Sequence, residues 1–157
     1  MSATLQSLIG IERDLGTHTF TAEEIITFAG KYDPQRFHVD PEAARKSNFG
    51  ALCASGWHTT AMWMRLNVED MKRQIKTAME RGEKPPQFGP SPGFEDLKWL
   101  KPVYAGDTIR FTRTLNGFRE LQSRPGWAMM QMSSAAYNQN DQKVLEFNSA
   151  ALILLVE

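Results

Sequence analysis

The hydrophobic positions of this chain repeat with a helical period in its first half and with a strand period after about residue 94. In the helical part, one stripe recurs at intervals of four and three residues: Trp57, Ala61, Met64, Val68 and Met71. This spacing predicts a long helix from about residue 55 to residue 71. Met62, Trp63 and Leu66 add apolar surface on its other sides. A helix that is apolar nearly all round is usually enclosed by the rest of the fold, so we expect the Met and Trp residues of this helix to lie in the core.

The second half of the chain alternates apolar and polar residues, which is the pattern of half-buried strands. In GDTIRFTRTLNG, Ile109 and Phe111 alternate with polar neighbours, and in KVLEFNSAALILLVE, Leu145, Phe147 and Ile153 share one face. Turns that contain Gly, Asn or Asp separate four such segments, at 94–104, 106–117, 127–138 and 143–157. Short connections between neighbouring strands indicate an antiparallel sheet. The sequence therefore predicts an α+β fold in which an antiparallel sheet wraps around one long central helix.

Shorter elements precede the long helix. Thr21 and Glu24 have the spacing of a capping box, which predicts a helix that Asp33-Pro34 ends. Asp40 and Pro41 have the residue types of an N-cap and a first helical position, which predicts a second, short helix. Residues 72–93 are charged and then rich in Pro and Gly, as expected of a solvated helix end and a loop.

Composition narrows the class of protein. A chain of 157 residues is most simply one domain, residues 1–157. Its 18 basic and 18 acidic residues cancel, which argues against nucleic acid or an anionic membrane as the main partner. A single cysteine forms no intrachain disulfide and favours a reducing compartment. We see neither a signal peptide nor the roughly 20 consecutive apolar residues of a membrane span, so we expect a cytoplasmic protein.

The candidate chemistry lies between the two predicted short helices and at the start of the long one. Asp33 and His38 lie in an irregular segment, where a carboxylate and an imidazole can hold and polarise one water molecule. Gly56, in the stretch ASGW, lets the backbone approach a ligand closely, and free amides at a helix N-terminus attract negative charge. Asp33, His38 and Asp40 lack a further strong ligand at a recognisable spacing, so we predict no metal site.

These residues resemble a known family, the MaoC-like dehydratases, which are hot-dog-fold proteins related to the (R)-specific enoyl-CoA hydratases. The likeness extends over nearly the whole chain and includes FAGKYDPQRFHVDPEAA, FGALCASGWHTTAMWMRL and SPGFEDLKWLKPVYAGDTIRF. It implies a hot-dog fold, a catalytic pair formed by Asp33 and His38, and a Gly56 amide that binds the thioester oxygen. The family usually has Asn-Pro where this chain has Gln35-Arg36.

The resemblance implies an acyl-CoA hydratase or dehydratase that reversibly adds water to a trans-2-enoyl thioester. We expect Ser55, Trp57 and Lys98 to contact the acyl-CoA substrate, no cofactor, and a homodimer or a higher homo-oligomer. A hot-dog thioesterase is one alternative, although the first turns of the long helix offer His58 and threonines but no carboxylate. A non-catalytic acyl-thioester binding module is another, suggested only by Gln35-Arg36. We expect His58 on the helix surface or at an interface, and Cys53 in buried packing.

Overall fold

The computed structural model describes residues 2–155, with side chains from residue 5 onward. Its helices and strands follow along the chain in this order: α1 (Ser2–Leu8), β1 (Glu12–Thr19), α2 (Ala22–Tyr32), α3 (Arg36–Val39), α4 (Pro41–Arg45), α5 (Gly56–Glu80), β2 (Gln87–Phe88), β3 (Gly93–Trp99), β4 (Thr108–Glu120), β5 (Trp127–Tyr137) and β6 (Lys143–Leu154).

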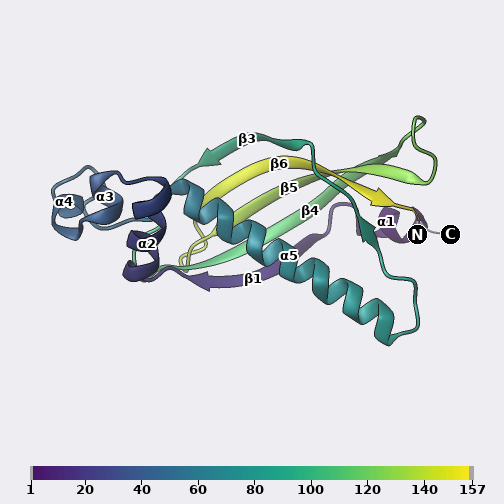
Figure 1. Cartoon of the computed structure of the whole chain (residues 1–157), viewed down its shortest axis with the longest axis horizontal. Helices are drawn as coiled ribbons and strands as arrows, with labels where there is room; N and C mark the ends of the chain where they lie inside the picture. Colours follow the sequence, from purple (N-terminus) through teal and green to yellow (C-terminus); the bar gives the residue numbers. More distant parts are fainter. Residues whose placement is uncertain (1, 156–157) are drawn as a thin grey trace.

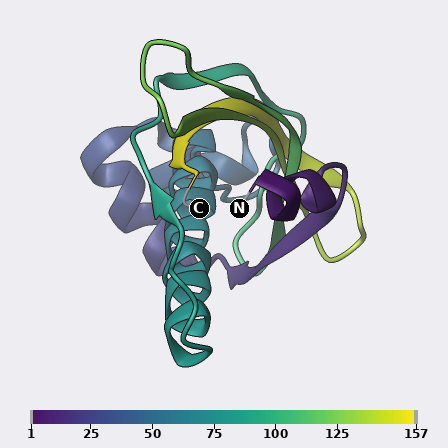
Figure 2. The same cartoon turned by 90° about the vertical axis from the view of Figure 1, so that its right-hand side faces the viewer.

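The strands form one antiparallel sheet that curls around α5 (Figures 1 and 2). Its order is β1-β4-β5-β6-β2, and β3 also pairs with β6. This arrangement confirms the predicted α+β architecture, and β3, β4, β5 and β6 are the four strands that the alternation predicted. The prediction for the C-terminal segment holds as far as Leu154, while Val156 and Glu157 lie outside the described residues.

Strand β1 was not predicted, because only Leu15 among its eight residues is buried. Its register against β4 shifts between Asp14 and Gly16, and Gly16 has a φ of 115° that favours glycine at this bulge. Such a strand at the edge of the sheet carries too little apolar alternation to stand out in the sequence.

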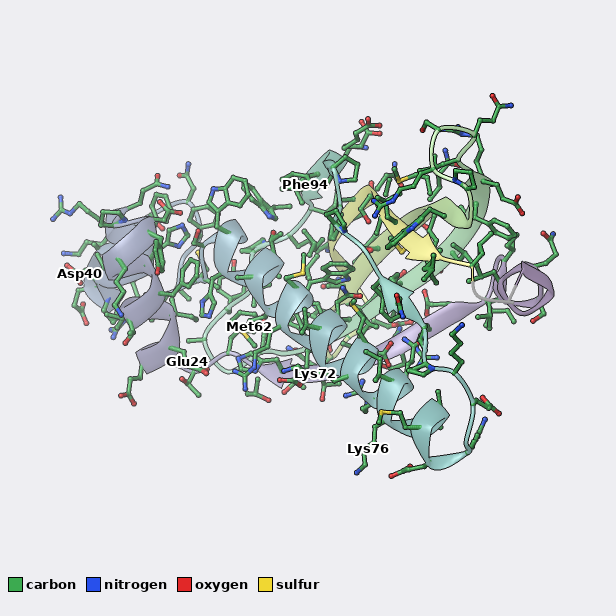
Figure 3. All side chains as sticks on the ribbon, turned by 45° about the vertical axis from the view of Figure 1, so that its right-hand side comes forward. Glu24, Asp40, Met62, Lys72, Lys76 and Phe94 are labelled. Carbon is green, nitrogen blue, oxygen red and sulfur yellow. The ribbon has the colours of Figure 1, made fainter. Side chains whose placement is uncertain are left out.

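Helix α5 begins where the sequence predicted and continues beyond residue 71 to Glu80. Its second half projects past the sheet in Figure 1, and Lys72 and Lys76 on this half are labelled in Figure 3. The prediction that the Met and Trp residues of this helix lie in the core is confirmed for Met62 and Trp63, but it is wrong for Trp57 and Met64, which are 50% and 52% exposed. The core instead receives the opposite side of the helix, which includes Met62 and Trp63. Apolar residues on both sides made the buried side ambiguous from periodicity alone.

Helices α2, α3 and α4 form a cap beside the start of α5, at the end of the sheet opposite to α1 (Figure 1). The predicted capping box of Thr21 and Glu24 is confirmed, as is the N-cap at Asp40, whose carboxylate accepts from the amides of Glu42 and Ala43. The main core joins this cap to α5 and the sheet, and includes Phe20, Ile25, Trp63 and Phe111. Among the described helices, none is both long and apolar enough to cross a membrane.

Candidate active site

Asp33 is held at the end of α2 by the backbone. Its amide donates to the carbonyl of Ala29 at 2.9 Å, and the following Pro34 cannot continue the helix. The chain turns there with φ −153° and ψ 67° at Asp33, and α3 begins at Arg36. The expectation that both residues lie in an irregular segment is wrong for His38, which lies on the short helix α3. Asp33 ends α2, so the two residues do not share a helix, and the turn brings their side chains together.

His38 lies on α3, within the cap, and is almost fully buried. Its Nδ1 lies 2.6 Å from the carbonyl oxygen of Cys53. A carbonyl only accepts, so Nδ1 carries the hydrogen, and Nε2 of the neutral ring has a free lone pair. Nε2 lies 3.4 Å from Oδ2 of Asp33. The backbone of Cys53 therefore fixes the tautomer that directs a basic nitrogen toward the carboxylate.

Both carboxylate oxygens of Asp33 accept hydrogen bonds. Ser55 Oγ donates to Oδ2 at 2.7 Å, and Gln35 Nε2 donates to Oδ1 at 2.8 Å. Burial by itself favours the protonated acid, but these two hydrogen bonds and the nearby His38 ring outweigh it and lower the pKa of Asp33 below its ordinary value. At neutral pH the site therefore contains an ionised carboxylate beside an imidazole.

Ser55 connects this pair to the long helix. It is the N-cap of α5, is 1% exposed, and its Oγ accepts from the amide of Trp57 at 3.3 Å. Its hydroxyl is thus engaged with Asp33 and Trp57, and its expected contact with a substrate stays a prediction. Gly56 is the first residue of α5, where backbone amides have no acceptor within the helix. The positive end of the helix dipole therefore lies beside Asp33 and His38.

Gly56 has a second reason to be glycine, which the sequence did not reveal. A Cβ added there would lie 2.7 Å from Cγ of Trp99 and would overlap its Cδ2 and Cε2 atoms. A larger side chain at Gly56 would therefore displace Trp99.

The two other residues expected to bind the substrate, Trp57 and Lys98, lie in different surroundings. Trp57 is half exposed, and its ring meets that of Trp99 edge to face at 5.0 Å. Lys98 does not join this group, because successive residues of a strand point to opposite faces of the sheet. Lys98 pairs with Glu146 at 3.5 Å, in a groove of about 350 Å³ that also includes Thr112, Ser133 and Asn148.

The sequence analysis also made predictions about the burial of Cys53 and His58. Cys53 is buried as expected, and burial raises the pKa of its thiol to about 11. The prediction that His58 lies on the helix surface or at an interface is wrong, because it is 5% exposed and stacks on Phe28 at 4.5 Å. Burial lowers the pKa of His58 to about 4, although the carboxylate of Glu24 opposes the shift. Its neighbours are aromatic, so it packs between α2 and α5.

A buried acid does occur on α5, at Asp70, but its charge is already paired. Arg13 donates to both oxygens of Asp70, at 2.7 and 2.9 Å, and Gln74 donates at 2.7 Å. Arg113 lies 3.5 Å away and also donates to Asn67. These partners lower the pKa of Asp70 despite its burial. Asp70 therefore ties α5 to β1 and β4. No group of three or more His, Cys, Asp or Glu within the described residues is placed to hold a metal ion.

Comparison with known proteins places this chain in a family. The model of the MaoC like domain matches residues 5–125. The chain is a MaoC-like domain. A MaoC-like dehydratase from Rhodospirillum rubrum has the same fold, with 32% identity, a TM-score of 0.76 and coverage of 95% of this chain and 94% of that one. The (R)-hydratase of A. caviae involved in PHA biosynthesis is 16% identical, with a TM-score of 0.63, and covers 94% of this chain and 96% of that one.

Curated relatives of this MaoC-like domain include the uncharacterized protein YdeM of Bacillus subtilis, which is 29% identical over 83% of this chain and 84% of its own length. The 3-hydroxyacyl-thioester dehydratase Z of Mycobacterium tuberculosis is 33% identical over 66% of this chain. The match spans 62% of the length of that relative. The family resemblance and the hot-dog fold inferred from the sequence are thus confirmed.

Proposed function

We propose that this MaoC-like domain reversibly hydrates trans-2-enoyl-CoA to 3-hydroxyacyl-CoA. The observation that carries the proposal is the distance of 3.4 Å between Nε2 of His38 and Oδ2 of Asp33. Two acceptors at this separation can both contact one water molecule, and the N-terminus of α5 lies beside them. Membership of a family that contains hydratases and dehydratases supports the same reaction.

In the proposed hydration, the water donates one hydrogen bond to Nε2 of His38 and the other to the ionised carboxylate of Asp33. His38 takes a proton as the oxygen attacks the β-carbon, and the electron pair of the C=C bond moves toward the thioester oxygen. The amides at the start of α5, including that of Gly56, stabilise the resulting enolate. The imidazolium then returns its proton to the α-carbon. Dehydration follows the same steps in reverse, and no net proton is gained or lost.

The environment of His38 suits both its uptake of a proton from water and its return of that proton to the α-carbon. The carbonyl of Cys53 accepts from Nδ1–H in the neutral and in the protonated ring, so the imidazole keeps its orientation throughout. The negative charge of Asp33 stabilises the imidazolium once it forms. Ser55 and Gln35 keep that carboxylate ionised and oriented.

Incubation with crotonyl-CoA tests the proposal. We expect the absorbance of the conjugated thioester to fall with no release of free thiol. Release of thiol would indicate thioester hydrolysis instead. Binding without either signal would indicate a non-catalytic acyl-thioester module.

We also propose a homodimer. Met64, Val68, Phe94 and Leu100 are 39–52% exposed, and they come from the uncovered side of α5, from β3 and from the residue that follows β3. Figure 3 labels Phe94 on this strand. Strand β3 pairs with β6 on one side only among the described residues, so its other edge is available to a second copy. An apolar surface beside a strand edge is typical of an interface.

A further inference from the structure

Trp99 is the last residue of β3, and its backbone is fixed to the active-site end of the fold. It pairs with Leu145 of β6, and the next amide, that of Leu100, donates to the carbonyl of Val144 at 2.8 Å. A few residues later, the carbonyl of Val103 accepts from the amide of Ala54 at 2.7 Å. The chain that carries Trp99 is thus bound directly to the segment that leads into Ser55 and Gly56.

The indole of Trp99 is held against the first turn of α5. It occupies the space next to Gly56 that a Cβ would otherwise fill. Its Nε1 donates to Oγ1 of Thr60 at 3.1 Å, and the same hydroxyl donates to the carbonyl of Gly56 at 2.9 Å. The ring is therefore fixed by close packing and by a hydrogen bond.

This position is adjacent to the reacting end of the substrate in the proposed function. If the thioester oxygen contacts the amide of Gly56, the carbonyl carbon and the atoms bonded to it lie next to the Trp99 ring. The distal acyl chain lies farther away. Trp99 is 45% exposed, so part of the residue is free to contact a ligand.

We propose that Trp99 is a specificity-determining residue that excludes substituents on the α-carbon of the acyl group. The inference rests on the proposed function, because that function places the thioester at Gly56. Trp99 thus discriminates between straight-chain and α-methyl thioesters. It leaves the preference for acyl chain length unchanged, since the distal chain does not reach it.

Calorimetric binding of two isomeric saturated thioesters, butanoyl-CoA and 2-methylpropanoyl-CoA, tests this inference without requiring turnover. The two ligands have the same atoms and differ in having a methyl group on the α-carbon. One misplaced methyl group in a tight pocket costs roughly 10–200-fold, so we expect the wild type to prefer butanoyl-CoA by at least about 10-fold. Trp99→Ala should reduce the ratio of the two dissociation constants by about fivefold or more. An unchanged ratio in Trp99→Ala would overturn the inference.

Trp127→Ala is the matched control. Trp127 also packs against a glycine, since a Cβ on Gly89 would lie 2.8 Å from its ring, and it begins β5 at the end of the sheet away from the cap (Figure 1). Its removal should leave the ratio unchanged. Thr60→Val removes the hydroxyl that accepts from the indole and donates to the carbonyl of Gly56, but keeps the indole itself. It should lower the ratio by a smaller factor, and it provides the test if Trp99→Ala does not fold.

Turnover separates this inference from the proposed function. The wild type should hydrate crotonyl-CoA faster than 2-methylcrotonyl-CoA, and Trp99→Ala should narrow the difference. A wild type that hydrates neither compound contradicts the proposed function, while the ratio of the two dissociation constants still tests Trp99. A wild type that hydrates crotonyl-CoA, with a binding ratio that Trp99→Ala does not change, contradicts only the role of Trp99.

Discussion

At the scale of single residues, the environment of Asp33 depends on an exposed amide. Gln35 occupies a position where the family usually has asparagine, and its longer side chain still donates to Oδ1 of Asp33. The sequence indicated that a side-chain amide was retained, but it did not show where the amide points. The carbonyl of Cys53 was not predictable at all, because a backbone acceptor has no signature in residue type.

Replacing Gln35 by Met should therefore change the pH dependence of catalysis more than stability. The substitution removes one of the hydrogen bonds that lower the pKa of Asp33, so this pKa should rise. Because both Asp33 and His38 must be deprotonated for the reaction, the acid limb of the profile of kcat/KM has two steps, and the step set by Asp33 should move to higher pH. The adjacent exposed residue provides a control, since Arg36→Met should leave the limb in place. An acid limb that does not move in Gln35→Met would show that the amide does not tune the carboxylate.

At the scale of elements, the sequence predicted the long helix and four of the strands, but it did not predict which face of the helix is buried. The alternation located four strands, and the ASGW stretch located the start of α5, because these signals are local. The buried face of α5 was missed, since the helix has apolar residues on both sides and only the curled sheet selects Met62 and Trp63. The ionic contacts of Asp70 join residues 57 positions apart and have no local pattern.

Asp70→Ala should destabilise the fold strongly, because it leaves the largely buried Arg113 without its carboxylate and detaches α5 from β1. Removing one partner of a buried ion pair typically costs about 3–5 kcal/mol. Chemical denaturation measures the loss. Glu69→Gln, which breaks only the exposed pair with Arg65, should cost less than about 1 kcal/mol. Equal losses for the two variants would contradict a structural role for the Asp70 network.

At the scale of the whole molecule, the cap, the long helix and the sheet meet at one end (Figure 1). Asp33 contacts His38 and the N-cap Ser55 of α5 at this end. The apolar side of α5 that the sheet leaves uncovered adjoins this end through Trp57. A second copy placed there would cover the surface and border the site.

Met64→Glu should weaken the proposed homodimer, because it introduces a charge into the apolar surface of α5. Light scattering at micromolar concentration should give a dimer for the wild type and a lower mass for the variant. Met79→Glu is the matched control, since Met79 is 64% exposed on the last turn of the same helix and should leave the mass unchanged. A monomeric wild type would contradict the dimer.

The central claim is that Asp33 and His38 act on the same water molecule, and a double-mutant cycle of crotonyl-CoA hydration tests it most directly. General acid–base groups typically contribute ~10²–10⁴-fold, and groups that act as a unit are not additive. Asp33→Asn and His38→Ala should each lower kcat by about that factor, and the double variant should be little slower than the slower single one. Binding of butanoyl-CoA should change far less. Single variants that hydrate crotonyl-CoA at nearly the wild-type rate, or losses that multiply in the double variant, would contradict the account.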